Sequence, residues 1–239
     1  MSKALFIDTS RCIACRGCQV ACKQWHGLPA VATRQRGTHQ NPPDLNPFNY
    51  KVVRFAEEKT AGKVEWLFFP DQCHHCLSPS CKSAAQSFAP GAIVVDKKTG
   101  AVIYTEETAK LTADQCKEIQ QACPYDIPRR NDATGRLTKC DMCVDRQHTG
   151  LPPVCVKTCC TGAMNHGERD KMLAMAHQRL EVVKASHPRA QLVDPDDAGV
   201  IYLVTNPKLA LQRPKKEAVA NYSRRELLGR LTAPFRHSV

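Results

Sequence analysis

The cysteines of this chain stand in groups whose spacing suits metal binding. The first group reads C-x2-C-x2-C-x3-C over residues 12–22, and the chain has 14 cysteines in all. Thiolates bind zinc and iron strongly, and a tight run of four can surround one small metal centre. A disulfide framework is the other common use of many cysteines, and it is typical of secreted proteins. The N-terminal run MSKALFIDTSRC has no apolar signal segment, so we expect metal ligands rather than disulfides.

The cysteines form four groups, of which the third is incomplete. The groups are Cys12, Cys15, Cys18 and Cys22; Cys73, Cys76 and Cys81; Cys116 and Cys123; and Cys140, Cys143, Cys155 and Cys159, with Cys160 beside the last. Bacterial ferredoxins use the run C-x2-C-x2-C-x3-C-P, in which the fourth cysteine ligates the other cluster of a pair. This rule predicts which groups exchange ligands.

The first and fourth groups form one such pair. The rule predicts a 4Fe–4S cluster on Cys12, Cys15, Cys18 and Cys159. It predicts a second cluster on Cys140, Cys143, Cys155 and Cys22. The long gap between 143 and 155 is then a loop insertion inside the run, which costs little because closure entropy grows slowly with loop length.

The second and third groups form a pair in which one partner has lost its ligands. The complete cluster is predicted on Cys73, Cys76, Cys81 and Cys123. The reciprocal cluster would use the residues Ala85, Ala113, Cys116 and Ile119. Every missing ligand belongs to this one cluster, so the sequence predicts three clusters and one vacated site. Cys116 is then expected to pack as a small apolar residue, and His74 and His75 to line the third cluster.

Charge and hydropathy limit the other functions. Each 4Fe–4S core of about +2 carries four thiolates, so three clusters would lower the formal charge of +11 to about +5. Much of the basic excess is thus interpreted as compensation for buried anionic cofactors, and no nucleic-acid partner is expected. Lys139, beside Cys140, could either donate to a cluster sulfur or lie on the surface. No apolar run approaches the roughly 18–20 residues of a membrane span. A zinc-binding interaction module is the alternative.

Short strands and helices must position these groups. Alternating and apolar runs predict strands at 4–8, 50–57, 64–69, 92–96, 101–105 and 200–205. Three- and four-residue spacing predicts a helix within 168–186, whose apolar face is Met172, Leu173, Ala176, Leu180 and Val183. Residues 34–49 are predicted to form a loop, and Trp66, Phe68 and Phe69 to belong to the core.

Cysteine loops between short strands and helices predict an α+β fold with two ferredoxin-like domains, the second inserted in the first. The first domain would comprise 1–66 and 127–167 with two clusters. The inserted domain would comprise 67–126 with one cluster and the vacated site. Residues 168–239 would form a C-terminal extension of helix, strand and basic tail that contacts a partner.

Several stretches resemble a known family. They are DTSRCIACRGCQVACKQW, HQNPPDLN, EWLFFPDQCHHC, ACPYDIPR and LTKCDMCVDR. Over roughly residues 1–167 the chain resembles the four-cluster ferredoxin-like electron-transfer subunits of molybdenum and tungsten pterin oxidoreductases. Within that family it is most similar to the iron–sulfur (beta) subunit of soluble formate dehydrogenases. It departs at Cys160, which stands where a proline usually follows the last ligand; spacing favours Cys159 as that ligand.

The resemblance implies a function without catalysis in this chain. A subunit of this kind relays electrons through three 4Fe–4S clusters, from a catalytic subunit with a tungsten or molybdenum pterin centre to a c-type cytochrome or similar acceptor. Such subunits are exported folded with their catalytic partner, which implies a periplasmic location for a chain without its own signal; the alternative is the cytoplasm. Polysulfide, nitrate and sulfoxide reductases use similar subunits, and they remain alternative donors or acceptors.

Overall fold

A four-stranded sheet organises the computed structural model, which describes residues 2–33, 38–60 and 62–208. Its strands, in spatial order, are β8 (Met164–Glu168), β1 (Lys3–Asp8), β10 (Val200–Val204) and β9 (Gln191–Val193). β1 pairs with β10 in parallel and with β8 antiparallel, so the first strand and the last lie side by side at its centre. Residues 4–7 of β1 and all five residues of β10 are buried and mainly apolar, as expected of strands with both faces covered.

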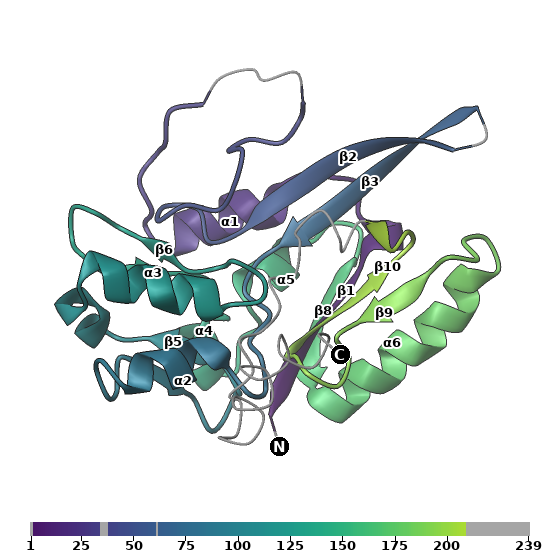
Figure 1. Cartoon of the computed structure of the whole chain (residues 1–239). Helices are drawn as coiled ribbons and strands as arrows, with labels where there is room; N and C mark the ends of the chain where they lie inside the picture. The colour runs from purple at the N-terminus through teal and green to yellow at the C-terminus, as the bar shows by residue number, and fades with distance from the viewer. Residues whose placement is uncertain (1, 34–37, 61, 209–239) are drawn as a thin grey trace, which may run out of the picture.

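One face of the sheet is covered by the helix α6 (Arg169–Lys184), as Figure 1 shows. Phe6, Ile201 and Leu203 pack there in one cluster that also contains Met172 and Ala176 of the helix. The opposite face carries Leu5, Ile7 and Tyr202, which pack toward the cysteine-bearing segments. The central sheet therefore separates α6, on one face, from the cysteine-bearing segments on the other.

A long hairpin of β2 (Val52–Thr60) and β3 (Lys63–Asp71) projects from the body of the protein (Figure 1). Its base joins the core, where Phe69 stacks on Tyr202 with 4.5 Å between the ring centroids. Further out, Trp66 is 59% exposed, so the prediction that it belongs to the core was wrong. The hairpin extends past the sheet at that point, where the Trp66 ring lies near Phe55 of the hairpin and His39 of the preceding loop.

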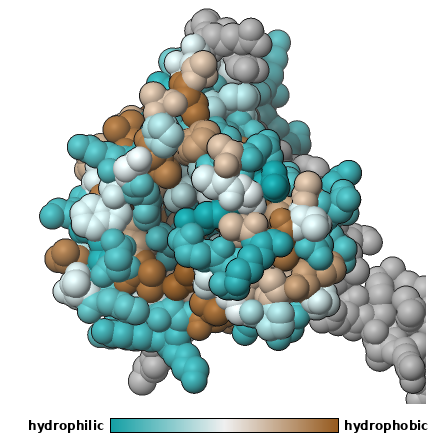
Figure 2. All heavy atoms as spheres, turned by 90° about the vertical axis from the view of Figure 1, so that its left-hand side faces the viewer, coloured by the Kyte–Doolittle hydropathy of each residue, from teal (hydrophilic) through white to brown (hydrophobic). Residues whose placement is uncertain are grey.

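The remaining elements carry or flank the cysteine loops. They are the 3₁₀ turns η1 (Thr9–Arg11) and η2 (Glu106–Lys110), the helices α1 (Gly17–Trp25), α2 (Ser80–Gln86), α3 (Ala113–Ala122), α4 (Val144–His148) and α5 (Val154–Thr158), and the strands β4 (Ile93–Val95), β5 (Val102–Tyr104), β6 (Arg129–Arg130) and β7 (Leu137–Thr138). α2 packs on α3, and α1 on α5. Figure 2 views the side that carries α2 and α3, where hydrophobic areas alternate with hydrophilic ones.

The structure is α+β, as expected, and it contains every strand predicted from the sequence. The hairpin predicted across KKTG is β4 with β5, and the predicted amphipathic helix is α6. The strands β8 and β9 were not predicted, because MNHGE and QLV are short and only partly apolar. The basic tail beyond 208 lies outside the described residues. Within those residues, no helix is long and apolar enough to cross a membrane.

Candidate metal centres

Three of the cysteine groups share one backbone conformation. The residue two positions after the first cysteine of each C-x2-C pair has a positive φ: Ala14 (53°), His75 (49°) and Met142 (61°). A left-handed conformation is uncommon for residues with a side chain and persists where its surroundings require it. The amide N–H of His75 donates to Cys73 Sγ at 3.4 Å, and that of Met142 donates to Cys140 Sγ at 3.4 Å. These loops wrap their own sulfur atoms, as a cluster-binding loop must.

The first thiol site consists of Cys12, Cys15, Cys18 and Cys159. Burial raises the pKa of Cys12, and the nearby thiols of Cys159 and Cys15 raise it further. Burial also raises the pKa of Cys18 to about 12. Cys160 is exposed, and its sulfur lies 3.9 Å from that of Cys15. Thiols of the first and fourth groups therefore lie near one another here, with both Cys159 and Cys160 at the site.

The second thiol site consists of Cys22, Cys140, Cys143 and Cys155. Burial raises the pKa of Cys22 well above its usual value, and the thiols of Cys155 and Cys143 act in the same direction. Burial likewise raises the pKa of Cys140, with Cys22 as the next cause. The packing of α1 on α5 makes this contact, because Cys22 lies on α1 and Cys155 on α5.

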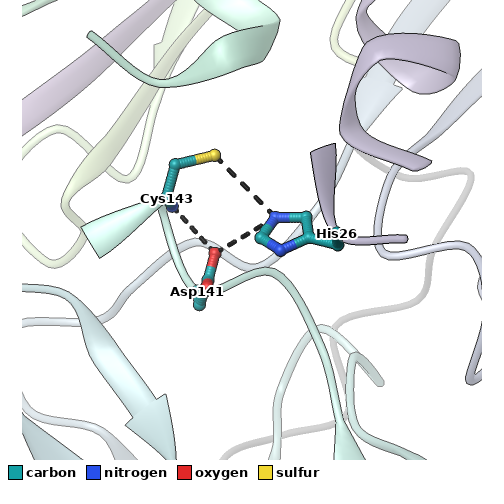
Figure 3. A group of neighbouring side chains, drawn as sticks. All are labelled: His26, Asp141 and Cys143. Atoms are coloured by element: carbon teal, nitrogen blue, oxygen red, sulfur yellow. Dashed lines mark hydrogen bonds and ion pairs between the residues drawn. The ribbon is translucent and has the colours of Figure 1, made fainter. Parts of the chain in front are cut away.

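His26 lies beside Asp141 and Cys143, a thiol of the second site (Figure 3). Its Nε2 lies 3.8 Å from Cys143 Sγ and 3.5 Å from Asp141 Oδ1. Asp141 Oδ1 also accepts the amide N–H of Cys143 at 2.8 Å. The three side chains could hold a single cation. Since Cys143 already belongs to a four-thiol site, the arrangement fits better as a histidine that hydrogen-bonds a ligand sulfur.

The third thiol site lines a cavity. The lining includes Cys73, Cys76, Cys81 and Cys123, together with His74, Tyr104, Tyr125 and Lys139. Burial raises the pKa of Cys76, and the thiols of Cys73, Cys123 and Cys81 raise it further. Burial raises the pKa of Cys123 to about 12. Four thiols face one cavity, and three of them, Cys73, Cys81 and Cys123, are buried. This is the donor set of a 4Fe–4S cluster, and the residues fit that group.

Polar side chains surround the third site closely. The Tyr104 hydroxyl lies beside the Cys81 thiol, and the ring of His74 stacks on Tyr125 at 3.7 Å. Lys139 is 8% exposed and donates to the carbonyl oxygen of Cys140 at 2.8 Å, so the alternative of a surface lysine was wrong. His74 lines the cavity as predicted, whereas His75 accepts the Val102 amide through Nδ1 in the protein interior. Burial lowers the pKa of His75 well below its usual value.

The predicted vacated site is packed with apolar side chains. Ala85, Cys116 and Ile119 are buried in one cluster with Leu111 and Leu137. Burial raises the pKa of Cys116, as expected of a thiol that packs as a small hydrophobic group. Ala113, the fourth position, is exposed at the start of α3. The segment that would have formed a ligand loop is this regular helix.

Lys51 is a site residue that the sequence analysis missed. It is 2% exposed, and the thiols of Cys155, Cys18 and Cys140 interact with its ammonium. The sequence feature that could have indicated it is a lysine at the start of the otherwise apolar strand YKVV. An argument from cysteine spacing does not consider such a residue.

The comparisons with known proteins separate iron–sulfur from zinc. Residues 64–169 match the family model of the 4Fe-4S dicluster domain. The chain is 57% identical to formate dehydrogenase 2 subunit beta (cytochrome c-553) of Nitratidesulfovibrio vulgaris, over 87% of this chain and 95% of that one. The chain belongs to the iron–sulfur subunits of formate dehydrogenases. It is also 52% identical to formate dehydrogenase subunit beta of Megalodesulfovibrio gigas, over 87% of this chain and 97% of the relative.

More distant relatives agree with this family. The chain is 37% identical to the iron-sulfur subunit of the nitrate-inducible formate dehydrogenase of Escherichia coli, over 89% of this chain and 72% of the relative. As a member of the family, this chain is an electron-transfer subunit that binds 4Fe–4S clusters. The zinc-module alternative finds no support in these relatives.

Proposed function

We propose that the chain binds three 4Fe–4S clusters, one at each thiol site, through the twelve cysteines named above. The observation that carries the proposal is the grouping of these thiols in fours, with each site drawing cysteines from two distant groups. A bound cluster supplies one-electron redox chemistry. The chain contributes the thiolates and the amide donors of the three loops, and it buries all four thiols of the second site.

The three sites lie in a row that suits a relay. Cys18 of the first site interacts with Cys155 of the second, and Cys140 of the second interacts with Cys73 of the third. The second site therefore lies between the other two. We infer that electrons pass along this row between a formate-oxidising or CO2-reducing subunit with a tungsten or molybdenum pterin centre and a c-type cytochrome or similar acceptor. The name of the Nitratidesulfovibrio relative, which includes cytochrome c-553, supports this acceptor class.

The proposal includes the domain arrangement and the location. Two ferredoxin-like units are proposed, with 67–126 inserted between 1–66 and 127–167. Within the inserted segment, Cys81, Ala85, Cys116 and Ile119 share one apolar cluster. The helix and strands after 168 pack on and within the central sheet beside β1. We expect export to the periplasm together with the catalytic subunit, which fractionation of cells would test.

Metal analysis tests the cluster count. The full chain purified without oxygen should contain about 12 iron atoms and an equal amount of acid-labile sulfide. In its complex with the catalytic subunit, formate should reduce the clusters, and added c-type cytochrome should reoxidise them. About 8 iron atoms or fewer in fully folded protein would overturn the count of three. Full loading without reduction by formate would overturn the proposed electron donor instead.

A further inference from the structure

Lys51 carries a charge into the protein interior. It directly precedes β2, is 2% exposed, and donates from Nζ to Oε1 of Gln72, the residue before Cys73. Burying an ammonium group costs several kcal/mol unless nearby negative charge compensates for it, so lysines are almost never fully buried without a partner. A neutral amide oxygen does not provide that charge. The compensation must come from other groups around Lys51.

Those groups are cysteines of two different thiol sites. The thiols that interact most with the Lys51 ammonium are Cys155, Cys140 and Cys22 of the second site and Cys18 of the first. Packing agrees, because the next residue, Val52, lies in one cluster with Cys140, and Val53 lies in one cluster with Cys18 and Cys155. The ammonium therefore lies between the first and second sites.

We propose that Lys51 is a fixed positive charge that raises the reduction potentials of the clusters at both the first and the second site. The proposal rests on the proposed function, since it requires clusters at both sites. A cluster with its four thiolates changes from about −2 to about −3 when it takes up one electron. A cation in the low-dielectric interior favours the more negative form.

Lys139 provides an internal contrast, because among the described residues it is the second buried lysine beside a thiol site. Its Nζ donates to the carbonyl oxygens of Val102 and Cys140 and lies 4.8 Å from the centre of the Tyr104 ring. Its charge acts on Cys81 of the third site. The two lysines thus face different clusters, and neutralising each one should have a different signature.

The test is a redox titration of the iron-loaded full chain, followed by low-temperature electron paramagnetic resonance. Lys51→Met removes the charge, Lys51→Gln removes it while keeping a donor for Gln72, and Lys51→Arg keeps it. Lys139→Met is the buried control, and Lys98→Met, on the surface, controls for net charge. Iron content is measured on every sample, so that cluster loading is known independently of the potentials.

We expect both uncharged Lys51 variants to bind an electron about tenfold more weakly at two clusters, which is 59 mV for one electron. The third cluster should keep its potential in these variants, and Lys51→Arg should retain the original potentials. Lys139→Met should shift the third cluster. Full iron loading with all potentials unchanged in Lys51→Met and Lys51→Gln would overturn the role of Lys51. A wild-type chain that holds fewer than three clusters would instead overturn the proposed function.

Discussion

The hydroxyl of Tyr125 donates a 2.7 Å hydrogen bond to Oδ2 of Asp194. Tyr125 follows Cys123 by two residues, and Asp194 directly follows β9 of the central sheet. Cys76, another thiol of the third site, forms an isolated β-bridge with Ala198, which lies in the segment between β9 and β10. The sheet therefore holds both sides of the third thiol site in place.

Removing that hydroxyl should loosen the third site without emptying the other two. Tyr125→Phe keeps the ring that stacks on His74 but loses a buried hydrogen bond to a charged group, which costs about 1.5–3 kcal/mol. We expect a lower thermal unfolding midpoint and faster loss of about 4 of the 12 irons to a chelator. Tyr50→Phe, at the ring of His26 beside the second site, is the control. Equal rates of iron loss in both variants would count against the assignment.

The two cysteines of the incomplete group should behave differently. Cys123→Ala removes a thiol from the cavity of the third site, so the purified chain should lose that cluster and hold about 8 iron atoms. Cys116→Ala removes a sulfur from an apolar cluster and should leave about 12 iron atoms. Equal iron content in the two variants would contradict the ligand set.

Restoring the missing cysteines should not restore a fourth cluster. The combined variant Ala85→Cys, Ala113→Cys, Ile119→Cys has the thiols that the exchange rule requires. However, residues 113–122 form a helix that begins with a capping box between Thr112 and Gln115. The side chains of an α-helix project outward, so its backbone cannot surround cysteine sulfur atoms as the three ligand loops do. We expect about 12 iron atoms by metal analysis, and about 16 would show that ligand identity alone builds the site.

His26 should tune the second cluster alone. His26→Phe keeps a ring against Tyr50 but removes the nitrogen that lies 3.8 Å from Cys143 Sγ. Loss of a hydrogen bond to a ligand sulfur should lower the potential of that cluster. Redox titration should show one shifted component out of three, with iron content unchanged. His148→Gln, an exposed histidine paired with Asp96, should shift none; a shift in both variants would refute a local effect.

Asp44 predicts a pH dependence of stability. Burial raises the pKa of Asp44, but hydrogen bonds from Arg54 and Arg129 outweigh it and lower the pKa to about 2. A depressed folded-state pKa contributes stability that is complete above the unfolded value of about 4 and is lost as the pH falls toward 2. The side chain is 46% exposed, so screening limits the contribution to about 1 kcal/mol.

Urea unfolding of Asp44→Asn checks this. The variant should be less stable than the original chain at pH 7, and the difference should shrink as the pH falls below about 4. Asp132→Asn is the control, because Asp132 pairs with Arg130 but is 92% exposed. A difference that stays constant down to pH 3 would show that Asp44 stabilises the loop by something other than its charge.

Much of the site could be predicted from local spacing. A C-x2-C-x2-C loop has few ways to place its sulfur atoms, so Cys12, Cys15 and Cys18 form a unit whatever surrounds them. The exchange rule then predicts which distant groups share a cluster, and these ligand sets stay predictions that metal analysis of the variants tests. The apolar packing at Ile119 follows from the same exchange rule, because side chains must fill the space that a lost cluster leaves in a close-packed interior.

The sequence by itself determined the thiol groups, the strands with clear alternation and the amphipathic helix, because each depends on neighbours a few residues away. Tertiary structure decided which long side chains are inside. Lys51 and Lys139 are buried and Trp66 is exposed because elements far away in sequence cover the first two and leave the third uncovered. The place of β10 between β1 and β9 is likewise a long-range pairing. A charge enters an interior only where several distant segments compensate for it, and no short window of sequence contains them all.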